Sequence, residues 1–325
     1  MTTPLTTAPS SRPPGGRGRA FWKRLKTGDE IAFLVTLACA SSVLLVTGLL
    51  VFELYQNSAL PRHKFGFSFL TSSVWNPVTE DFGALPFIYG TVVTSALALL
   101  IGIPLGVGAA IFLAELAPAR ISAGLTFLIE LLAAVPSVIY GLLGIFILVP
   151  AIRSAEPFLR GTLGWTGLFT GPFYGVSLLS AGVVLSVMIL PFIISISREV
   201  ILAVPNDQRE AALALGATRW ETTWDIVLPY AKNGITGSIF LALARSLGET
   251  MAVTMVIGND PKIMGSLFAP GYSIAAVIAN EFTEATGDMY PGALIELGLV
   301  LFGLTIIINA IARILVAGRR VKGAA

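Results

Sequence analysis

The chain of 325 residues has few side chains that could carry out chemistry on their own. It holds one cysteine, Cys39, and one histidine, His63. This excludes an internal disulfide, a multi-cysteine metal site, and a metal cluster or proton relay built from histidines. The Gly-x4-Gly-Lys-Ser/Thr pattern that cradles nucleotide phosphates is also missing. We therefore expect no catalytic residue, no metal site and no nucleotide site on this chain.

Charged residues are scarce as well, at 12% against 55% hydrophobic residues, with a mean hydropathy of +0.82. Such a composition is typical of a polytopic membrane protein. A membrane-spanning helix needs about 20 mainly apolar residues. Six stretches qualify, so the predicted fold class is all-α and polytopic with six transmembrane helices: Ile31–Phe52, Phe87–Leu113, Ser122–Val149, Val176–Ser197, Gly234–Gly258 and Gly292–Val316.

The basic residues predict the orientation, because cytoplasmic segments carry an excess of Lys and Arg. With the N-terminus inside, only five of the 21 Lys and Arg fall in outside loops, and Arg245 lies within a span. The five are Arg62, Lys64, Arg153, Arg160 and Lys262. Both termini are therefore predicted to be cytoplasmic. The expected parts are a disordered basic tail (1–28), a first span with an extracytoplasmic segment (29–86), a transmembrane core (87–316) and a cytoplasmic tail (317–325).

A polar segment, Glu210–Pro229 (EAALALGATRWETTWDIVLP), separates the fourth and fifth apolar runs on the predicted cytoplasmic side. Its first half predicts a short helix. Asn206 is expected to be the N-cap, and Asp207 and Glu210 fall in the first turn, where negative charge favours the helix dipole. Gly216 is expected in the left-handed conformation that ends a helix.

The second half of this segment predicts another short helix. Thr218 and Glu221 have the spacing of a capping box, which starts a helix. Pro229 is expected to end that helix before the next apolar run. The small side chains of Ala211 and Ala212 would let a partner protein approach the first helix closely. The interpretation is a helix-turn-helix on a membrane loop that a partner could grip.

Arg245 and Glu249 lie within the fifth predicted span, four residues apart, which in one helix would place them on a shared face. A charge near the bilayer centre costs about 2.5–3.5 kcal/mol, so such residues usually face a bundle interior or a water-filled path. Arginine is a natural partner for a tetrahedral oxyanion. We interpret Arg245 as an anion gate and Glu249 as its resting partner. The alternative is a structural ion pair.

Two further carboxylates, Glu130 and Glu296, fall within predicted spans. They are interpreted as structural, with hydrogen bonds between helices; the alternative is that they face the path. Pro136 is expected to free a backbone carbonyl. Four residues near it are expected to serve close helix packing: Ser137, Tyr140, Gly141 and Gly144.

Two outside loops stand out. Glu53–Pro86 is rich in aromatic residues, which suits an interfacial anchor or a short re-entrant piece. Asn259–Pro291 is acidic at its end, at Glu281, Glu284 and Asp288. These acidic residues are interpreted either as a docking surface for an external protein or as ordinary solvated loop.

The polar segment resembles the EAA loop of ABC importer permeases, whose pattern is EAA, three residues, Gly, nine residues and Ile-x-Leu-Pro. Every fixed position matches: Glu210, Ala211, Ala212, Gly216, Ile226, Leu228 and Pro229. The resemblance implies a type I importer permease fold and a multi-pass protein of the bacterial plasma (inner) membrane. It also implies that this loop (206–229) is a coupling helix, which docks into a groove on a separate cytoplasmic ATPase.

Four other stretches look like one branch of these permeases, the PstC family of phosphate permeases. They are Phe67–Pro77 (FSFLTSSVWNP), Phe82–Thr91 (FGALPFIYGT), Glu130–Gly141 (ELLAAVPSVIYG) and Ala244–Asn259 (ARSLGETMAVTMVIGN). In that family an Arg-x3-Glu, matched here by Arg245 and Glu249, is considered important for phosphate passage. The implied machine imports inorganic phosphate. It contains the partner permease PstA, two copies of the ATPase PstB that bind ATP and Mg, the external binding protein PstS and regulators of PhoU type.

Three other functions stay open. A permease for sulfate or molybdate would share the EAA loop and could share an arginine. A secondary transporter would use ion gradients and often shows inverted repeats, which this sequence lacks. A membrane sensor or scaffold would recruit cytoplasmic partners without moving a substrate. Nucleic-acid binding is not expected, because only the N-terminal tail is basic and the orientation rule explains it.

Overall fold

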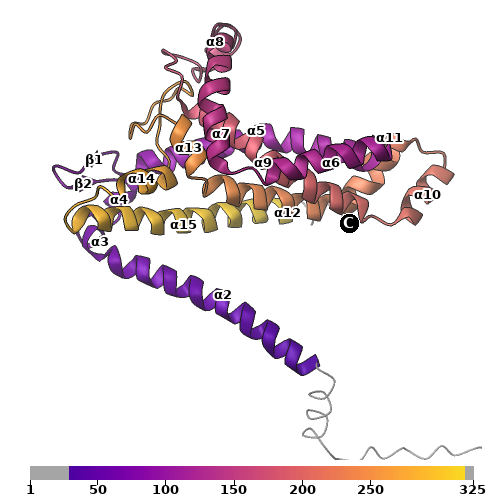
Figure 1. Ribbon diagram of the computed structural model, residues 1–325, viewed down its shortest axis with the longest axis horizontal. Coiled ribbons are helices and arrows are strands. Elements are labelled where there is room, and N and C mark those ends of the chain that lie inside the picture. The colour runs from indigo at the N-terminus through magenta and orange to yellow at the C-terminus, as the bar shows by residue number, and fades with distance from the viewer. Residues whose placement is uncertain (1–28, 319–325) are drawn as a thin grey trace, which may run out of the picture. The chain divides into compact units, whose positions relative to one another are not determined.

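The computed structural model describes residues 29–318, with side chains from residue 31 to residue 314. The predicted basic tail, residues 1–28, and residues 319–325 of the C-terminal tail lie outside the described residues. Contacts along the chain define two compact units, one up to Glu53 and one from Leu54 onward. The second unit holds nearly all of the secondary structure and is almost wholly helical, as the composition predicts (Figure 1).

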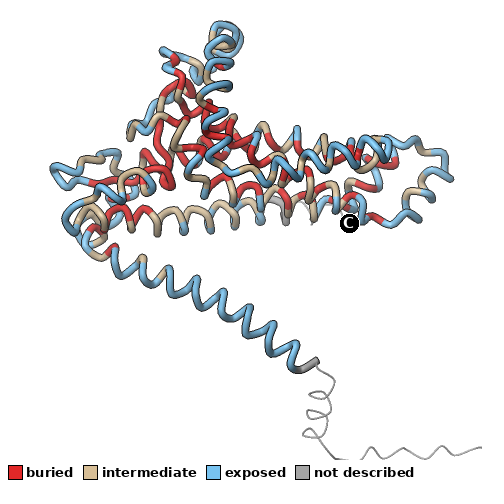
Figure 2. The backbone as a smooth tube through the Cα atoms, viewed as in Figure 1, coloured by how far each residue is buried: buried red, intermediate tan, exposed pale blue. Residues whose placement is uncertain are grey.

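Among the residues that the structure describes, the first unit is most of one helix, α2 (Asp29–Asn57). Its run Ile31–Asn57 has a mean hydropathy of 2.3 and is long enough to cross a membrane. The side chains from residue 31 to residue 50 are all exposed in this chain, which Figure 2 shows as a pale blue tube. A helix that is apolar on every side requires a hydrocarbon environment or another protein around it.

Six helical runs in the described part of the chain can cross a membrane, which is the predicted number. They are Ile31–Asn57, Leu85–Leu116, Ser137–Thr166, Leu178–Leu202, Arg219–Leu247 and Met289–Ile314. Four of them match predicted spans within several residues. The third and fifth do not, because the helix is broken within each predicted stretch.

The predicted third span, Ser122–Val149, is two helices. The first, α6 (Ala119–Ala133), ends before Pro136, and α7 (Ser137–Leu143) begins after it. Proline has no N–H for the helix ladder, and its ring disfavours helical geometry at the residue before it. Beyond α7 the chain runs through a π-helical turn and α8 (Val149–Leu163) to a 3₁₀ turn, η3 (Gly164–Thr166).

The predicted fifth span, Gly234–Gly258, is also divided. Its first helix, α12 (Leu228–Leu247), stops at Leu247, and α13 (Met251–Val256) begins after a break of three residues. The helical run that contains α12 starts well before the predicted position, at Arg219.

Three π-helical turns occur in the described chain, and each lies next to a proline. They are η1 (Phe112–Leu116) before Pro118, η2 (Gly144–Leu148) before Pro150, and η4 (Thr222–Val227) before Pro229. At Pro150 and Pro229, where the chain continues as a helix, the wider π turn gives room where the proline ring would otherwise collide with the carbonyl four residues earlier. Before Pro118 the helix ends at Leu116, and Ala117 is extended.

The central helix of the second unit is α9 (Leu178–Leu202), which packs along α5 (Leu85–Ile111), α6 and α12. Figure 1 shows α5, α9 and α12 side by side, and Figure 2 shows the buried backbone concentrated along them. Small residues allow the close approach. A methyl group on Gly106 of α5 would lie only 2.7 Å from the Ile193 Cγ2 atom of α9.

The end of the helices opposite α10 and α11 carries a small aromatic cluster (Figure 1). It is built from α3 (Ala59–Phe65), α4 (Ser68–Thr71), α14 (Ile274–Glu281), α15 (Met289–Gly318) and an antiparallel hairpin. The hairpin joins β1 (Trp75–Asn76) to β2 (Asp81–Phe82), with Trp75 opposite Phe82. The predicted anchor is therefore a packed hairpin with ring contacts.

Candidate functional site

The first helix of the EAA loop is α10 (Asn206–Ala214). Asp207 lies in its first turn, as predicted, but Glu210 lies just past that turn, so the prediction for Glu210 is wrong. The prediction of Asn206 as the N-cap is wrong. Pro205 occupies the cap position, and the Asn206 Oδ1 atom accepts a hydrogen bond of 3.3 Å from Arg209 instead. A proline already holds the extended backbone that a helix start needs, so the asparagine oxygen is free to position an arginine.

Gly216 ends α10 as predicted, with φ of +91°. The amide of Gly216 donates to the Leu213 carbonyl at 3.0 Å, and the amide of Ala217 donates to the Ala212 carbonyl at 3.1 Å. These two bonds form a Schellman motif, which satisfies the last carbonyls of a helix and turns the chain sharply. A side chain at Gly216 would meet nothing within 4 Å, so the backbone conformation alone explains the glycine.

The predicted capping box is present at α11 (Arg219–Glu221). The Thr218 Oγ1 atom accepts from the Glu221 amide at 3.2 Å, and the Glu221 carboxylate accepts from the Thr218 amide at 2.7 Å. The prediction that Pro229 ends this helix is wrong. The chain stays helical through η4 into α12, because Pro229 lies in the first turn after the π-helical turn. The second helix of the EAA loop is therefore continuous with α12 through η4.

The EAA loop presents apolar side chains to solvent. Leu215 is 90% exposed, while Trp220 and Trp224 are each more than half exposed and stack with ring centroids 5.8 Å apart. Glu210 and Ala211 are exposed, and Ala212 is half-buried. An exposed row of large apolar residues beside small ones is a surface suited to contact with another protein.

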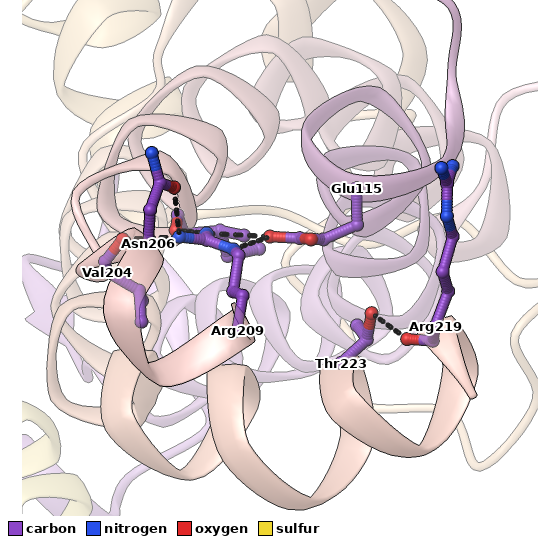
Figure 3. Close-up of polar contacts among 7 residues, drawn as sticks. Glu115, Val204, Asn206, Arg209, Arg219 and Thr223 are labelled. Carbon is purple, nitrogen blue, oxygen red and sulfur yellow. Dashed lines mark hydrogen bonds and ion pairs between the residues drawn. The ribbon is translucent and has the colours of Figure 1, made fainter. Parts of the chain in front are cut away.

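A buried polar contact, between Arg209 and Glu115, holds α10 to the rest of the protein. Arg209 donates from Nη2 and Nε to the Glu115 Oε1 atom, at 2.8 Å and 3.2 Å (Figure 3). Its Nη2 atom also donates to the Ile201 carbonyl at 2.8 Å, and its Nη1 atom donates to the Val204 carbonyl. The side chains of Arg209 and Glu115 are only 15% and 13% exposed. Sequence reasoning placed neither residue in the site.

Arg245 lies on the last turn of α12, partly buried against α9. Its guanidinium carbon is 4.5 Å from the centroid of the Phe192 ring, a cation–π contact. Its Nε atom is buried and finds no hydrogen-bond acceptor among the described residues. Arg245 thus has donor capacity that the protein does not use.

Glu249 does not share a helical face with Arg245, which corrects the prediction. It lies in the non-helical Gly248–Thr250 break, where its Oε1 atom accepts from the Ala252 amide at 3.4 Å at the start of α13. Within the described chain no hydrogen bond or ion pair joins the two side chains. The Glu249 carboxylate is therefore engaged in starting the next helix.

The two breaks occur in helices that pack together. α7 and α13 are neighbours, and two glycines, Gly141 of α7 and Gly144 at the start of η2, allow close packing against α13. A methyl group on Gly144 would lie 2.7 Å from Val256 Cγ1, and Gly141 faces Met255 and Ala252. The predicted packing role of these glycines is thereby explained. Broken helices at membrane depth are tolerated where they are buried in protein or line a cavity.

The remaining predicted carboxylates differ in their surroundings. Glu130 is exposed on α6. Glu296 is 6% exposed on α15, and its Oε2 atom finds no partner in the described chain. It borders a cavity of about 480 Å³ that is lined by Arg62 and mainly apolar residues. Arg245 does not line this cavity.

The acidic end of the outer loop is only partly a free surface. The Glu281 Oε2 atom accepts from Trp75 Nε1 at 2.9 Å and from the Tyr290 hydroxyl at 2.6 Å, so it holds the hairpin to α14 and α15. Glu284 and Asp288 are exposed. Burial raises the pKa of the nearby Tyr272 phenol, which therefore stays neutral and accepts from Asn280 at 3.0 Å.

Comparison with known proteins gives consistent matches. Residues 102–321 match the family model described as binding-protein-dependent transport system inner membrane component. The chain is 50% identical to the phosphate transport system permease protein PstC of Mesorhizobium japonicum, over 90% of each chain. It is 45% identical to the protein of the same name from Xylella fastidiosa, over 97% of each.

A solved structure agrees on the fold. A chain from a bacterial ABC transporter involved in the import of the acidic polysaccharide alginate superposes with a TM-score of 0.55 at 18% identity. The match covers 90% of this chain and 98% of the other.

Proposed function

Because this chain belongs to the family of binding-protein-dependent transport system inner membrane components, we infer that it is the permease subunit of an ATP-driven importer of inorganic phosphate. The observation that carries this conclusion is the EAA loop, folded as an exposed helix-turn-helix that is continuous with a membrane helix. The phosphate assignment rests on relatives named phosphate transport permease at 45–50% identity over nearly their whole length.

The protein is a multi-pass inner-membrane subunit that works with an ATPase and a binding protein, as its family implies. We propose the partner permease PstA, two copies of the ATPase PstB, the external binding protein PstS and regulators of PhoU type as the specific partners. We also propose that this chain itself catalyses nothing, and that ATP and Mg are bound by the ATPase. The lack of a phosphate-binding loop in the sequence supports this.

We propose that both termini and the EAA loop are cytoplasmic. The distribution of Lys and Arg supports this orientation. So does the position of the aromatic hairpin at the opposite end of the helices from α10 (Figure 1). The proposed parts keep the bounds expected from the sequence: tail 1–28, first span and outer segment 29–86, core 87–316 and tail 317–325.

In the proposed mechanism the ATPase grips the EAA loop. The residues assigned to coupling are Glu210, Ala211, Ala212, Gly216, Ile226, Leu228 and Pro229. Closure of the ATPases would push on α10, and the continuous helix from α11 to α12 would carry that movement toward Arg245. The free donor capacity of Arg245 supports a role in binding phosphate on its path. Glu249, four residues away in a break, would keep that binding weak enough for release.

The test is phosphate uptake in cells that lack this chain, complemented with wild type, Gly216→Trp or Arg245→Leu, with sulfate and molybdate as competitors. The proposal expects uptake with wild type only, resistant to both competitors, while all three proteins reach the membrane. Full competition by sulfate would instead assign the permease to another oxyanion. No uptake of any oxyanion with wild type would contradict the transport function.

A further inference from the structure

We propose that the contact between Glu115 and Arg209 is the positioning link that makes α5 and α9 move with the EAA loop. This inference rests on the proposed coupling function and deepens it. Glu115 and Arg209 lie outside the EAA pattern itself. They would act through the helices that they join, without touching the ATPase or the transported anion.

The first support is the way Arg209 uses its donors. All three guanidinium nitrogens donate: to the Glu115 carboxylate, to the Ile201 carbonyl in the last turn of α9, to the Val204 carbonyl just beyond that helix, and to Asn206 (Figure 3). The last carbonyls of a helix have no partner within that helix, and a cation is favourable there. Arg209 therefore caps α9 while it stands on α10.

The second support is the position of Glu115. It lies in η1, the π-helical turn that directly continues α5. One side chain of α10 thus touches the ends of two membrane helices that are far apart in the sequence. Both side chains are more than four-fifths buried, so the ion pair is only weakly screened by solvent and is held in one geometry.

The third support is the packing around the pair. A cluster of buried apolar residues joins the same ends of α5 and α9 to η4 and α12. It consists of Ala110, Ile111, Ile201, Val204, Val227, Ala231 and Ile235. The apolar cluster holds the ends of α5, α9 and α12 together, and the Arg209 side chain connects α10 to that packed end.

The movement has a direct route to the candidate anion site. Ile201 and Phe192 lie on the same helix, α9. The Ile201 carbonyl accepts a hydrogen bond from Arg209, and the Phe192 ring makes the cation–π contact with Arg245. At 1.5 Å per residue Ile201 and Phe192 are ~14 Å apart along the α9 axis. A rigid α9 would therefore transmit a displacement of its Arg209-bound end to the ring beneath Arg245.

The test uses the whole complex, with partner permease, ATPase and binding protein, reconstituted in lipid vesicles. Glu115→Gln, Arg209→Gln and the double variant are compared for ATP hydrolysis, for ATPase retained on purification and for anion imported per ATP. Glu156→Gln, which breaks the exposed Arg160–Glu156 ion pair of α8, is the matched control.

The expected result is that each single variant keeps its ATPase and its basal hydrolysis but imports about 10-fold less anion per ATP. The double variant should be little worse than either single one, because the two residues act as one link. Glu115→Asp and Arg209→Lys should recover part of the import per ATP. The Glu156→Gln control should match wild type.

Unchanged import per ATP in Glu115→Gln would overturn the inference, and so would loss of the ATPase in proportion to the loss of import. If the single variants do not assemble, the Asp and Lys variants decide, since full import per ATP in both would also contradict it. Failure of the proposed substrate is a separate outcome. If wild type imports sulfate in place of phosphate, the same ratio measured with sulfate still tests the link.

Discussion

The hydroxyl of Tyr140 donates a 2.7 Å hydrogen bond to the carbonyl oxygen of Leu132. In an unbroken helix that carbonyl would accept from the amide of residue 136, but residue 136 is a proline and has no N–H. The tyrosine hydroxyl, one turn further along on α7, supplies a donor at the break. The break between α6 and α7 is thus a satisfied feature of the fold, in a region where water is scarce.

Tyr140→Phe is expected to destabilise the protein by about 1 kcal/mol, because it removes one of two donors to the Leu132 carbonyl, the other being the Val135 amide at 3.2 Å. Thermal unfolding of the purified complex in detergent measures this. Tyr174→Phe, at a ring that is 67% exposed, is the matched control and should change little. In a Pro136→Ala background the new amide can serve Leu132, so the same substitution should cost less. An equal cost in both backgrounds would contradict the explanation.

Gly216→Val is expected to reduce transport strongly, because a β-branched residue is strained at a φ of +91° and the Schellman turn would be distorted. Gly216→Asn is the control, since asparagine tolerates the left-handed conformation much better. Uptake and the amount of ATPase that co-purifies measure the effect. If valine and asparagine behave alike, the turn conformation is not what requires glycine here.

Arg245→Leu is expected to lower phosphate uptake about 10- to 100-fold, through loss of charged hydrogen bonds to the passing anion. Arg245→Lys should retain part of the activity, since it keeps the charge but not the planar fork of donors. Arg313→Leu is the matched control, because Arg313 also lies over a phenylalanine ring, that of Phe240. Uptake at saturating phosphate, with protein levels in the membrane determined, is the measurement. Wild-type uptake by Arg245→Leu would remove this residue from the path.

Glu281→Ala is expected to loosen the outer hairpin, because Trp75 and Tyr290 lose their common acceptor, at a cost of about 1–3 kcal/mol. Limited proteolysis near residues 75–82 and thermal unfolding should both report it. Glu284→Ala, at an exposed carboxylate of the same loop, should leave both unchanged. A larger effect at Glu284 than at Glu281 would contradict the assignment of Glu281 as the residue that holds the hairpin.

The parts of the EAA loop that were predicted correctly are those decided by neighbours in the sequence. The left-handed Gly216 and the Thr218–Glu221 capping box depend on residues no more than five positions apart. The error at Pro229 has a different origin. A π-helical turn leaves no mark in the sequence comparable to a capping box, so a proline is naturally interpreted as the end of a helix.

The candidate anion site was predicted only in part. Hydropathy indicated that Arg245 and Glu249 lie inside one long apolar run, but it does not register a three-residue break such as Gly248–Thr250. The prediction that Arg245 and Glu249 share a helical face was wrong because it assumed one continuous helix. Arg209 was missed because its partner lies 94 residues earlier in the chain. The one available signal was a lone acidic residue, Glu115, just past the second apolar run, on the same side as Arg209.

That separation also has a consequence for synthesis. Ribosomes add roughly 5–20 residues each second, so Glu115 is made about 5–20 s before Arg209 exists. During that interval the Glu115 carboxylate lacks the arginine that pairs with it in the folded chain. It can become buried only after the fourth span has been inserted and its following loop has emerged. Closure of the Glu115–Arg209 contact would thus mark a late step of biogenesis, at which the nascent chain first acquires a surface that an ATPase can use.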